Sequence, residues 1–398
     1  MNSSRHVLRG RAFSAYHCEK KMEEERVAYC ALNMLLGSRP RTGMALVGHF
    51  GSASAVFRNA GNELAVLIPE LEASSWGKAL EEAEKELGKT SEEGGVFICP
   101  DDIAYPPMLA ECEDPPLGLY VKCNSDPAEI FGNPLCLALV GTRDMSSYGR
   151  DWCREFIDSL ARTGQKPLII SGLAYGVDIT AHQAALEAGL PTVGVMATGI
   201  DTVYPGAHRH IASRMAGTEG CALVTDYPIG TAPVAHNFLR RNRIIAGLAS
   251  KTILVESRVK GGGMTTARLA YSYEREVYAL PGRVWDSRSE GCNLLIYKKI
   301  AEPVGLPDAT VEAMGLGKPA KKRDMPGVIS KVYADLEPQM RRDMESLARV
   351  LVKERGLGPE ELAFKAGIST QQVRVLTGLL EADGLATVDL TGACSLEL

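Results

Sequence analysis

The stretch Leu135–Gly149, LCLALVGTRDMSSYG, decides the fold of this chain. It joins a short apolar run to a loop that begins with glycine, and an amphipathic segment follows. A short apolar run bounded by a turn is typical of a fully buried strand. The same order of apolar run, loop and helical segment recurs downstream, and it predicts further strands at residues 167–171, 192–196, 221–225, 252–256 and 277–282. Strands that alternate with helices predict an α/β fold with a mostly parallel sheet.

Patterns on either side of this region predict further domains, because 398 residues exceed one ordinary core. The expected doubly wound, Rossmann-like domain covers residues 96–300. Before it, residues 1–23 are expected to form a flexible N-terminus without a signal peptide, and residues 24–95 a small helical domain of helix-hairpin-helix type. After it, residues 301–335 are rich in Pro, Gly and Lys and are expected to be a linker. Residues 336–398 have the helix-turn-helix and strand pattern of a winged helix.

Composition excludes several classes of protein. The net charge is −5, which argues against sequence-independent adhesion to nucleic acid through the whole surface but permits a local basic patch. No apolar run approaches the roughly 18–20 residues of a membrane span. The ten cysteines are scattered, without CxxC or a Cys/His cluster. We therefore expect a cytoplasmic protein with reduced thiols, and neither a metal nor a cofactor.

Four loops after predicted strands have a composition that suits anions. Their sequences are VGTRDMSSYG, SGLAYG, MATGID and RVKGGGMTTA. Glycines let backbone N–H groups approach a ligand, and Ser and Thr add hydroxyl groups. None matches GxGxxG or GxxxxGK[ST], which disfavours a standard dinucleotide or P-loop site. Four such loops in one sheet predict a phosphate-binding site.

The stretch NFLRRNRIIAGLASKTILVES, Asn237–Ser257, adds a cluster of positive charge. Arg240, Arg241 and Arg243 precede an apolar run, and no Asp or Glu occurs between Pro228 and Val255. Burying guanidinium groups is costly unless an anion compensates them. The compensating anions are either distant carboxylates, such as Asp201, Asp226 or Glu256, or phosphates, with Phe238 stacked on a base.

These motifs together resemble one family. LVGTRDMSSYG, IISGLAYGVDITAHQAAL, TGIDTVYP, NFLRRNRIIAGLASKTILVES, KGGGMTTARLA and VYALPG follow one another as in the DprA/Smf family of DNA-processing proteins, over about residues 100–300. The resemblance implies a non-enzymatic homodimer that binds single-stranded DNA in natural transformation. It also implies that the protein protects incoming DNA and helps to load the RecA recombinase.

The residue patterns and the resemblance together define the candidate DNA-binding residues. They are Gly141, Thr142, Arg143, Ser171, Gly172, Phe238, Arg240, Arg241, Asn242, Arg243, Lys260, Gly261, Gly262, Gly263 and Thr265. Many family members have serine where Gly261 and Gly263 stand here, so two hydroxyl contacts would be lost. The resemblance also suggests that Arg241→Glu should abolish single-strand binding without unfolding the chain.

Two other functions compete with this interpretation. Nucleoside monophosphate phosphoribohydrolases, which are Rossmann-type enzymes, carry a catalytic Glu where this chain has Leu269, and this favours the binding protein. A winged-helix transcriptional regulator is the second alternative, but Gln371, Gln372 and Arg374 give the expected recognition helix one positive charge, which also fits a protein-interaction module. Asp178 and His182 are expected to act as a helix cap and a structural hydrogen-bonding group.

Overall fold

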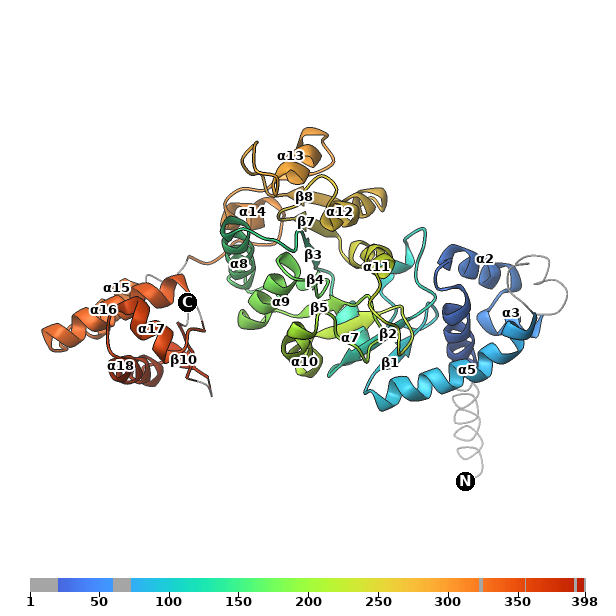
Figure 1. The fold of residues 1–398 in the computed structure, drawn as a ribbon, viewed down its shortest axis with the longest axis horizontal. Helices are drawn as coiled ribbons and strands as arrows, with labels where there is room; N and C mark the ends of the chain where they lie inside the picture. The colour runs from blue at the N-terminus through green and yellow to red at the C-terminus, as the bar shows by residue number, and fades with distance from the viewer. Residues whose placement is uncertain (1–20, 60–72, 322–324, 355, 390–391, 397–398) are drawn as a thin grey trace, which may run out of the picture. The chain divides into compact units, whose positions relative to one another are not determined.

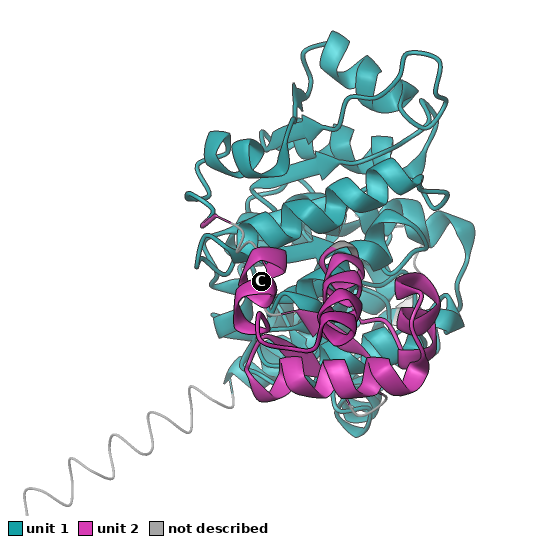
Figure 2. Ribbon diagram, turned by 90° about the vertical axis from the view of Figure 1, so that its left-hand side faces the viewer, with its two compact units in different colours: residues 1–319 teal, residues 320–398 magenta. Residues whose placement is uncertain are grey.

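The computed structural model describes residues 21–59, 73–321, 325–354, 356–389 and 392–396. The expectation for the first twenty residues, and Cys18 with it, lies outside the described residues. The chain forms two compact units, residues 1–319 and residues 320–398 (Figure 2).

A nine-stranded sheet organises the first unit (Figure 1). Its strands are β1 (Val96–Ile98), β2 (Leu119–Cys123), β3 (Cys136–Val140), β4 (Leu168–Ser171), β5 (Thr192–Val195), β6 (Ala222–Thr225), β7 (Lys251–Leu254), β8 (Glu276–Ala279) and β9 (Glu302–Pro303). Their order is β1-β2-β6-β5-β4-β3-β7-β8-β9. All neighbours from β6 to β9 are parallel, whereas β2 pairs antiparallel with β6 and β1 antiparallel with β2.

This strand order confirms the predicted doubly wound α/β fold, and all six predicted strands form, as β3 to β8. The chain builds β4, β5 and β6 outward on one side of β3, then returns to place β7, β8 and β9 on the other side. The direction of winding therefore reverses between β3 and β7. Ligands of such sheets bind at this switch point, outside the carboxyl ends of the strands.

Helices cover both faces of the sheet because its central strands are apolar on both sides. Leu137 and Leu139 of β3 pack into one core, and Ala138 and Val140 into the other. The first face carries α8 (Ser147–Ala161), α9 (Val177–Glu187), η1 (Gly206–His208), α10 (Arg209–Gly217) and α14 (Pro307–Ala313). The second carries α6 (Pro107–Ala110), α7 (Pro127–Phe131), α11 (Ala235–Leu248), α12 (Gly262–Ser272) and α13 (Glu290–Tyr297).

The predicted helical region packs against the antiparallel edge of the sheet. Residues 21–36 are helical, and α2 (Pro40–Phe50), α3 (Ala53–Arg58) and α5 (Ala73–Glu92) follow. Their apolar faces share one core with Phe97 and Tyr120, which lie on β1 and β2. Residues 24–95 therefore contain helices as expected but belong to the same compact unit as the sheet.

The expected linker, residues 301–335, contains regular elements in the two parts that the structure describes, residues 301–321 and 325–335. Its first part forms β9 and α14, and Val304, Val311 and Met314, in or next to these elements, are buried in the core under α8. Its last part forms α15 (Met325–Val332), which belongs to the second unit. Proline and glycine mark the ends of these short elements, and the few apolar residues between them are too sparse to show a period.

The second unit contains three further helices and a hairpin. They are α16 (Pro338–Lys353), α17 (Pro359–Ala366), α18 (Thr370–Ala382) and the antiparallel strands β10 (Ala386–Val388) and β11 (Cys394–Leu396). Gly367 ends α17 in the left-handed region, and Ser369 begins α18 with a capping box that it shares with Gln372. The order of elements is the one that a winged helix requires, and the assignment to that class stays a prediction.

Candidate functional site

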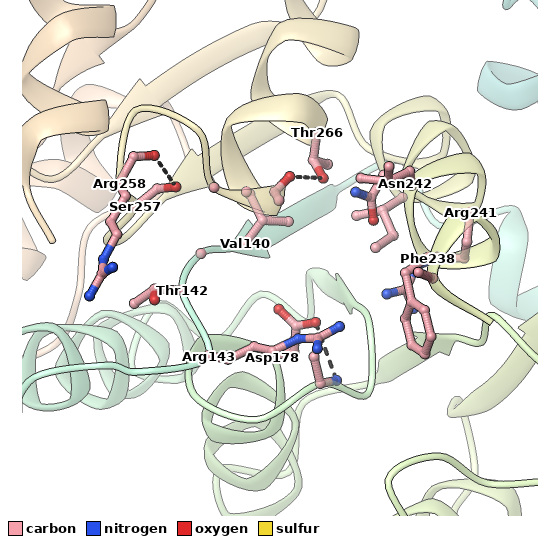
Figure 3. Close-up of a pocket in the computed structure, with 18 of the residues that line it drawn as sticks. Val140, Thr142, Arg143, Asp178, Phe238, Arg241, Asn242, Ser257, Arg258 and Thr266 are labelled. Carbon is pink, nitrogen blue, oxygen red and sulfur yellow. Dashed lines mark hydrogen bonds between the residues drawn. The ribbon is translucent and has the colours of Figure 1, made fainter. Parts of the chain in front are cut away.

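A cleft of about 880 Å³ opens at the switch point of the sheet. Its walls come from the loop after β3, the first half of α11 and the loop between β7 and α12 (Figure 3). It brings together a large part of the predicted site: Gly141, Thr142, Arg143, Phe238, Arg241, Asn242, Lys260, Gly261, Gly262 and Gly263. Sequence patterns placed these residues on three separate segments, and the parallel sheet brings the segments to one edge.

The loop after β3 holds one wall of the cleft. The Thr142 N–H donates a hydrogen bond of 2.7 Å to the carbonyl oxygen of Glu256, which ties this loop to the end of β7. A Cβ atom at Gly141 would lie 2.5 Å from Cγ2 of Val177, so this position requires glycine. The exposed Arg143 guanidinium lies 5.2 Å from the ring centroid of Phe238. The wall therefore presents a cation and an aromatic ring side by side.

The loop between β7 and α12 forms a backbone cradle on the other wall. Gly261 is the N-cap residue of α12, and the helix begins at Gly262, so its free N–H groups and its positive dipole end lie at the cleft. A Cβ atom at Gly263 would lie 2.9 Å from Cα of Gly141, which shows how closely the two loops approach. At Gly262, by contrast, a Cβ atom would meet nothing within 4 Å.

The two glycines differ in the space around a Cβ atom, and we therefore expect different effects of serine at the two positions. Gly263→Ser should lower the free energy of unfolding by about 1–3 kcal/mol, because the added atoms must push the two loops apart. Gly262→Ser should change it by less than about 0.5 kcal/mol, because its side chain enters open space. Thermal unfolding of the two variants measures the contrast. Equal stability of both variants would contradict the close approach of the loops.

Arg241 is buried in the floor of the cleft and makes no ion pair among the described residues. It is 4% exposed, its Nη1 donates to the carbonyl oxygen of Val195, and its Nε has no hydrogen-bond partner. Burial lowers the pKa of Arg241, whereas the charge of Asp178 raises it. A Cβ atom at Gly172 would lie 2.6 Å from Nη2 of Arg241, so the glycine leaves room for the guanidinium.

Asp178 lies beside Arg241 on the cleft floor. Burial raises the pKa of its carboxyl group, and the positive charge of Arg241 opposes this rise. The expectation that Asp178 caps α9 is wrong, because Gly176 is the N-cap residue and Asp178 stands inside the first turn. Its carboxylate instead accepts a hydrogen bond of 3.4 Å from the N–H of Ala174. Asp178 therefore contributes negative charge beside Arg241.

Arg240 and Arg243 form ion pairs with a buried carboxylate. The sequence left open whether carboxylates or phosphates compensate these arginines, and their partner in the structure is a carboxylate. Nη2 of Arg240 and Nη2 of Arg243 lie 2.9 and 2.8 Å from Oδ2 of the buried Asp226. Arg243 also donates to the carbonyl oxygen of Asp114, and Arg240 lies 4.5 Å from the ring centroid of Tyr227. Neither arginine lines the cleft. Their compensating anion is a carboxylate from the end of β6.

Three other predicted residues also lie off the cleft surface. The buried Ser171 donates a hydrogen bond of 2.6 Å to the carbonyl oxygen of Leu139, so its hydroxyl group is used within the sheet. Gly172 leaves room for Arg241 by its lack of a side chain, and its carbonyl oxygen contacts His182. Thr266 lines the cleft in place of Thr265. Adjacent positions on a helix differ by about 100° in direction, and the sequence alone did not show which threonine faces inward.

Among the cleft residues that sequence reasoning missed are an aromatic ring and a cation, those of Tyr204 and Arg258. Tyr204 lies in the motif TGIDTVYP, and its ring contacts that of Phe238 edge-to-face at 5.5 Å between centroids. Arg258 begins the loop between β7 and α12 and is exposed at the cleft. A signal for both existed, since each belongs to a glycine-containing loop after a strand.

His182 is buried beneath the cleft and has a structural role. Its Nε2 lies 2.6 Å from the carbonyl oxygen of Gly172, and its Nδ1 lies 2.7 Å from Oγ1 of Thr192. Burial lowers the pKa of His182 to about 4. Burial and the positive charge of Arg241 lower this pKa, and the hydrogen bond to Gly172 opposes them only in part. The two hydrogen bonds agree with the expectation of a structural role.

The lowered pKa of His182 predicts acid sensitivity. At a pH below the ordinary pKa of histidine, His182 is protonated in the unfolded chain but not in the folded chain. The folded state therefore loses stability as the pH falls toward 4. From about pH 7 to about pH 5 this loss should reach roughly 2 kcal/mol. His182→Gln should remove that part of the pH dependence, as urea unfolding at the two pH values would show. An unchanged pH dependence in the variant would contradict the assignment.

The thiols, possible metal ligands and long helices of the described residues add no further site. All nine described cysteines are free thiols, and burial raises the pKa of most of them, to about 12 for Cys153 and Cys292. Among the residues that the structure describes, no group of His, Cys, Asp and Glu is arranged to hold a metal ion. None of the described helices combines the length and the apolar character needed to cross a bilayer.

The fold and the cleft define a doubly wound α/β protein with glycine-rich loops and cationic side chains at its switch point. The sequence profile described as DNA recombination-mediator protein A matches residues 96–315, and the chain belongs to this family, also known as DprA/Smf.

Individual relatives agree with this assignment. A putative DNA processing protein DprA from Mycobacterium tuberculosis is 31% identical over 85% of this chain and 86% of its own length. Protein Smf of Escherichia coli is 39% identical over 56% of this chain, and the match spans 57% of that relative's length. The crystal structure of DprA from Streptococcus pneumoniae superposes with a TM-score of 0.60 at 27% identity, over 72% of this chain and 97% of that one.

Proposed function

We propose that the cleft binds the phosphate backbone of single-stranded DNA. The observation that carries this proposal is the set of positive groups around the cleft without carboxylate partners. Arg143, Arg258 and Lys260 are exposed there and form no ion pair among the described residues. The buried Arg241 adds a fourth cation, whose charge Asp178 offsets in part. Free cations that converge on an open cleft favour a polyanion.

The aromatic rings favour a single strand over a duplex. Phe238 and Tyr204 line the same cleft as the cations, and unpaired bases can stack on such rings whereas paired bases cannot reach them. The chain as a whole has a net charge of −5, so the positive field is confined to the cleft. This arrangement supports a site that follows one strand and has little sequence preference.

The proposal does not include catalysis. Leu269, which stands where the related nucleotide-cleaving enzymes carry a glutamate, packs against the apolar core. His182 is buried with both nitrogens engaged, and so cannot serve as a general base in the cleft. We infer a binding protein without cofactor or metal, which acts in the cytoplasm as a homodimer. It would protect incoming DNA in natural transformation and help to load the RecA recombinase.

We infer that the last part of the second unit, residues 356–396, contacts protein and not DNA. Between residues 356 and 396 the chain carries two basic side chains, Lys365 and Arg374, against five acidic ones. Gln372, on the expected recognition helix, is already engaged with Ser369 and with Asp343 at 2.8 Å. Phosphate contacts need cations, so this surface is poorly suited to a DNA backbone.

A salt titration tests the proposed function. Binding of the full chain to a labelled single strand is measured by fluorescence anisotropy at increasing salt, with the corresponding duplex as the control. We expect tighter binding to the single strand, with a log–log slope of about −2 to −3 for three to four phosphate contacts. Absence of binding at low salt, or equal affinity for the duplex, would overturn the proposal.

A further inference from the structure

Trp285 is the one exposed tryptophan of the chain. It is 95% exposed, whereas Trp76 and Trp152, the other two, are 4% and 7% exposed. It lies on residues 280–289, the loop that joins β8 to α13. The neighbouring Val284 is exposed as well. Leaving a large indole in water forgoes the favourable free energy of its burial.

Several hydrogen bonds hold both ends of this loop. The amide of Asn293 exchanges two hydrogen bonds with the backbone of Gly282, at 3.2 and 3.1 Å. The hydroxyl group of Tyr148 donates to the carbonyl oxygen of Pro281 at 2.9 Å. Nε of Arg288 donates to the carbonyl oxygen of Asp144 at 3.0 Å. The loop is therefore preorganised, and binding at its tip would cost little ordering entropy.

The same loop lies directly beside the cleft. The N–H of Ser257, a cleft residue, donates to the carbonyl oxygen of Arg288 at 2.7 Å, and the N–H of Gly291 donates to the carbonyl oxygen of Ser257 at 2.8 Å. This follows from the strand order, because β7 and β8 are neighbours and their loops leave the same edge of the sheet (Figure 1).

Exposed arginine side chains occur both at the cleft and on the loop. Arg258 at the cleft is exposed, and so is Arg283, which stands two residues before Trp285; neither makes an ion pair within the described ranges. The remaining charged groups of the loop are partly engaged: Arg288 pairs with Asp144 at 3.1 Å, and the carboxylate of Asp286 accepts from the N–H of Arg288 at 2.9 Å. An exposed indole beside unpaired arginines suits a base and its phosphate.

We propose that Trp285 is a second stacking site, which receives a base of the same single strand where the strand leaves the cleft past Arg258. The proposal rests on the proposed function, because it takes the cleft to be the first site on the strand. It commits to nucleic acid for two reasons: the loop is continuous with the cleft wall, and it carries the exposed Arg283, whereas the carboxylate of Asp286 accepts a backbone hydrogen bond. The indole would extend the bound length of the strand without adding sequence preference.

Intrinsic fluorescence tests this directly, because only Trp285 is exposed. An oligothymidylate of about 16 nucleotides should quench the tryptophan emission of the full chain, and one of about 4 nucleotides, confined to the cleft, should leave it nearly unchanged. Binding of the longer strand, shown by anisotropy, without any change in emission would overturn the proposal.

Substitution of Trp285 provides a second test of the stacking site. Trp285→Ala should weaken binding of the longer strand by about 5- to 100-fold and leave the shorter one unchanged, and Trp285→Phe should retain most of the affinity. Ile103→Ala, which removes another exposed apolar side chain, is the matched control. Equal affinity of Trp285→Ala and wild type for the longer strand would overturn the inference alone, since the cleft would still bind DNA.

Two further outcomes would each overturn the stacking site for a different reason. Loss of subunit association in Trp285→Ala, measured by sedimentation, would make the loop a contact between copies of the chain and would overturn the stacking site. If neither strand binds even the wild-type protein, the proposed function fails and the inference fails with it.

Discussion

Arg143→Glu combined with Lys260→Glu should weaken binding of single-stranded DNA by about 100-fold or more. Each exposed side chain would donate a charge-assisted hydrogen bond to a phosphate, worth about 1.5–3 kcal/mol, and each glutamate would repel the phosphate instead. The log–log salt slope should also become shallower by about 1.4, since two contacts are lost at about 0.7 each. Anisotropy titrations at several salt concentrations measure both quantities.

A matched variant controls for net charge. Lys166→Glu with Arg214→Glu makes the same change in charge at exposed positions before β4 and in the last turn of α10, toward the amino ends of the strands. This control should retain its affinity within a few fold and its salt slope. An equal loss in both double variants would indicate a general effect of charge, and would contradict a phosphate site at the cleft.

The structure also changes which substitutions are informative. Arg241→Glu, the test that the sequence suggested, would bury a second carboxylate beside Asp178 in a position that is 4% exposed. The expected result is unfolding as well as lost binding, since an unpaired buried charge costs several kcal/mol. Arg143 and Lys260 are exposed, and their replacement separates binding from folding.

Asp226→Asn should lower the free energy of unfolding of the first unit by about 3–5 kcal/mol. Oδ2 of Asp226 lies within 3 Å of both Arg240 and Arg243, and its side chain is fully buried. Removing this charge leaves two partly or fully buried guanidinium groups without their shared carboxylate. Urea unfolding followed by tryptophan fluorescence reports on the first unit alone, because all three tryptophans lie in it.

An exposed ion pair provides the comparison for Asp226. Glu113→Gln breaks the pair with Arg41, in which both side chains are more than half exposed, and should cost no more than about 1 kcal/mol. If Asp226→Asn were as stable as Glu113→Gln but bound DNA poorly, the two arginines would have to be assigned to phosphates. The contrast thus tests the structural role that the geometry gives them.

Local pattern was sufficient for much of the fold. The strands β3 to β8 were predictable because each is a short apolar run between turn residues, and both faces of a parallel sheet are buried. The antiparallel pairing of β1 and β2 onto β6 was not, because strand partners are chosen by packing across the sheet. The elements β9 and α14 were missed because the apolar residues in this part of the chain are few and only tertiary contacts bury them.

The sequence by itself determined the α/β class, the loops that would carry the site and the family resemblance, since these depend on periodicity and on residue types in order. Only the tertiary structure decided which charges are free. Arg240, Arg241 and Arg243 are near neighbours in the chain, yet two pair with Asp226 and one faces the cleft. Neighbouring positions on a helix point in different directions, so each side chain's partner is set by the element packed against it.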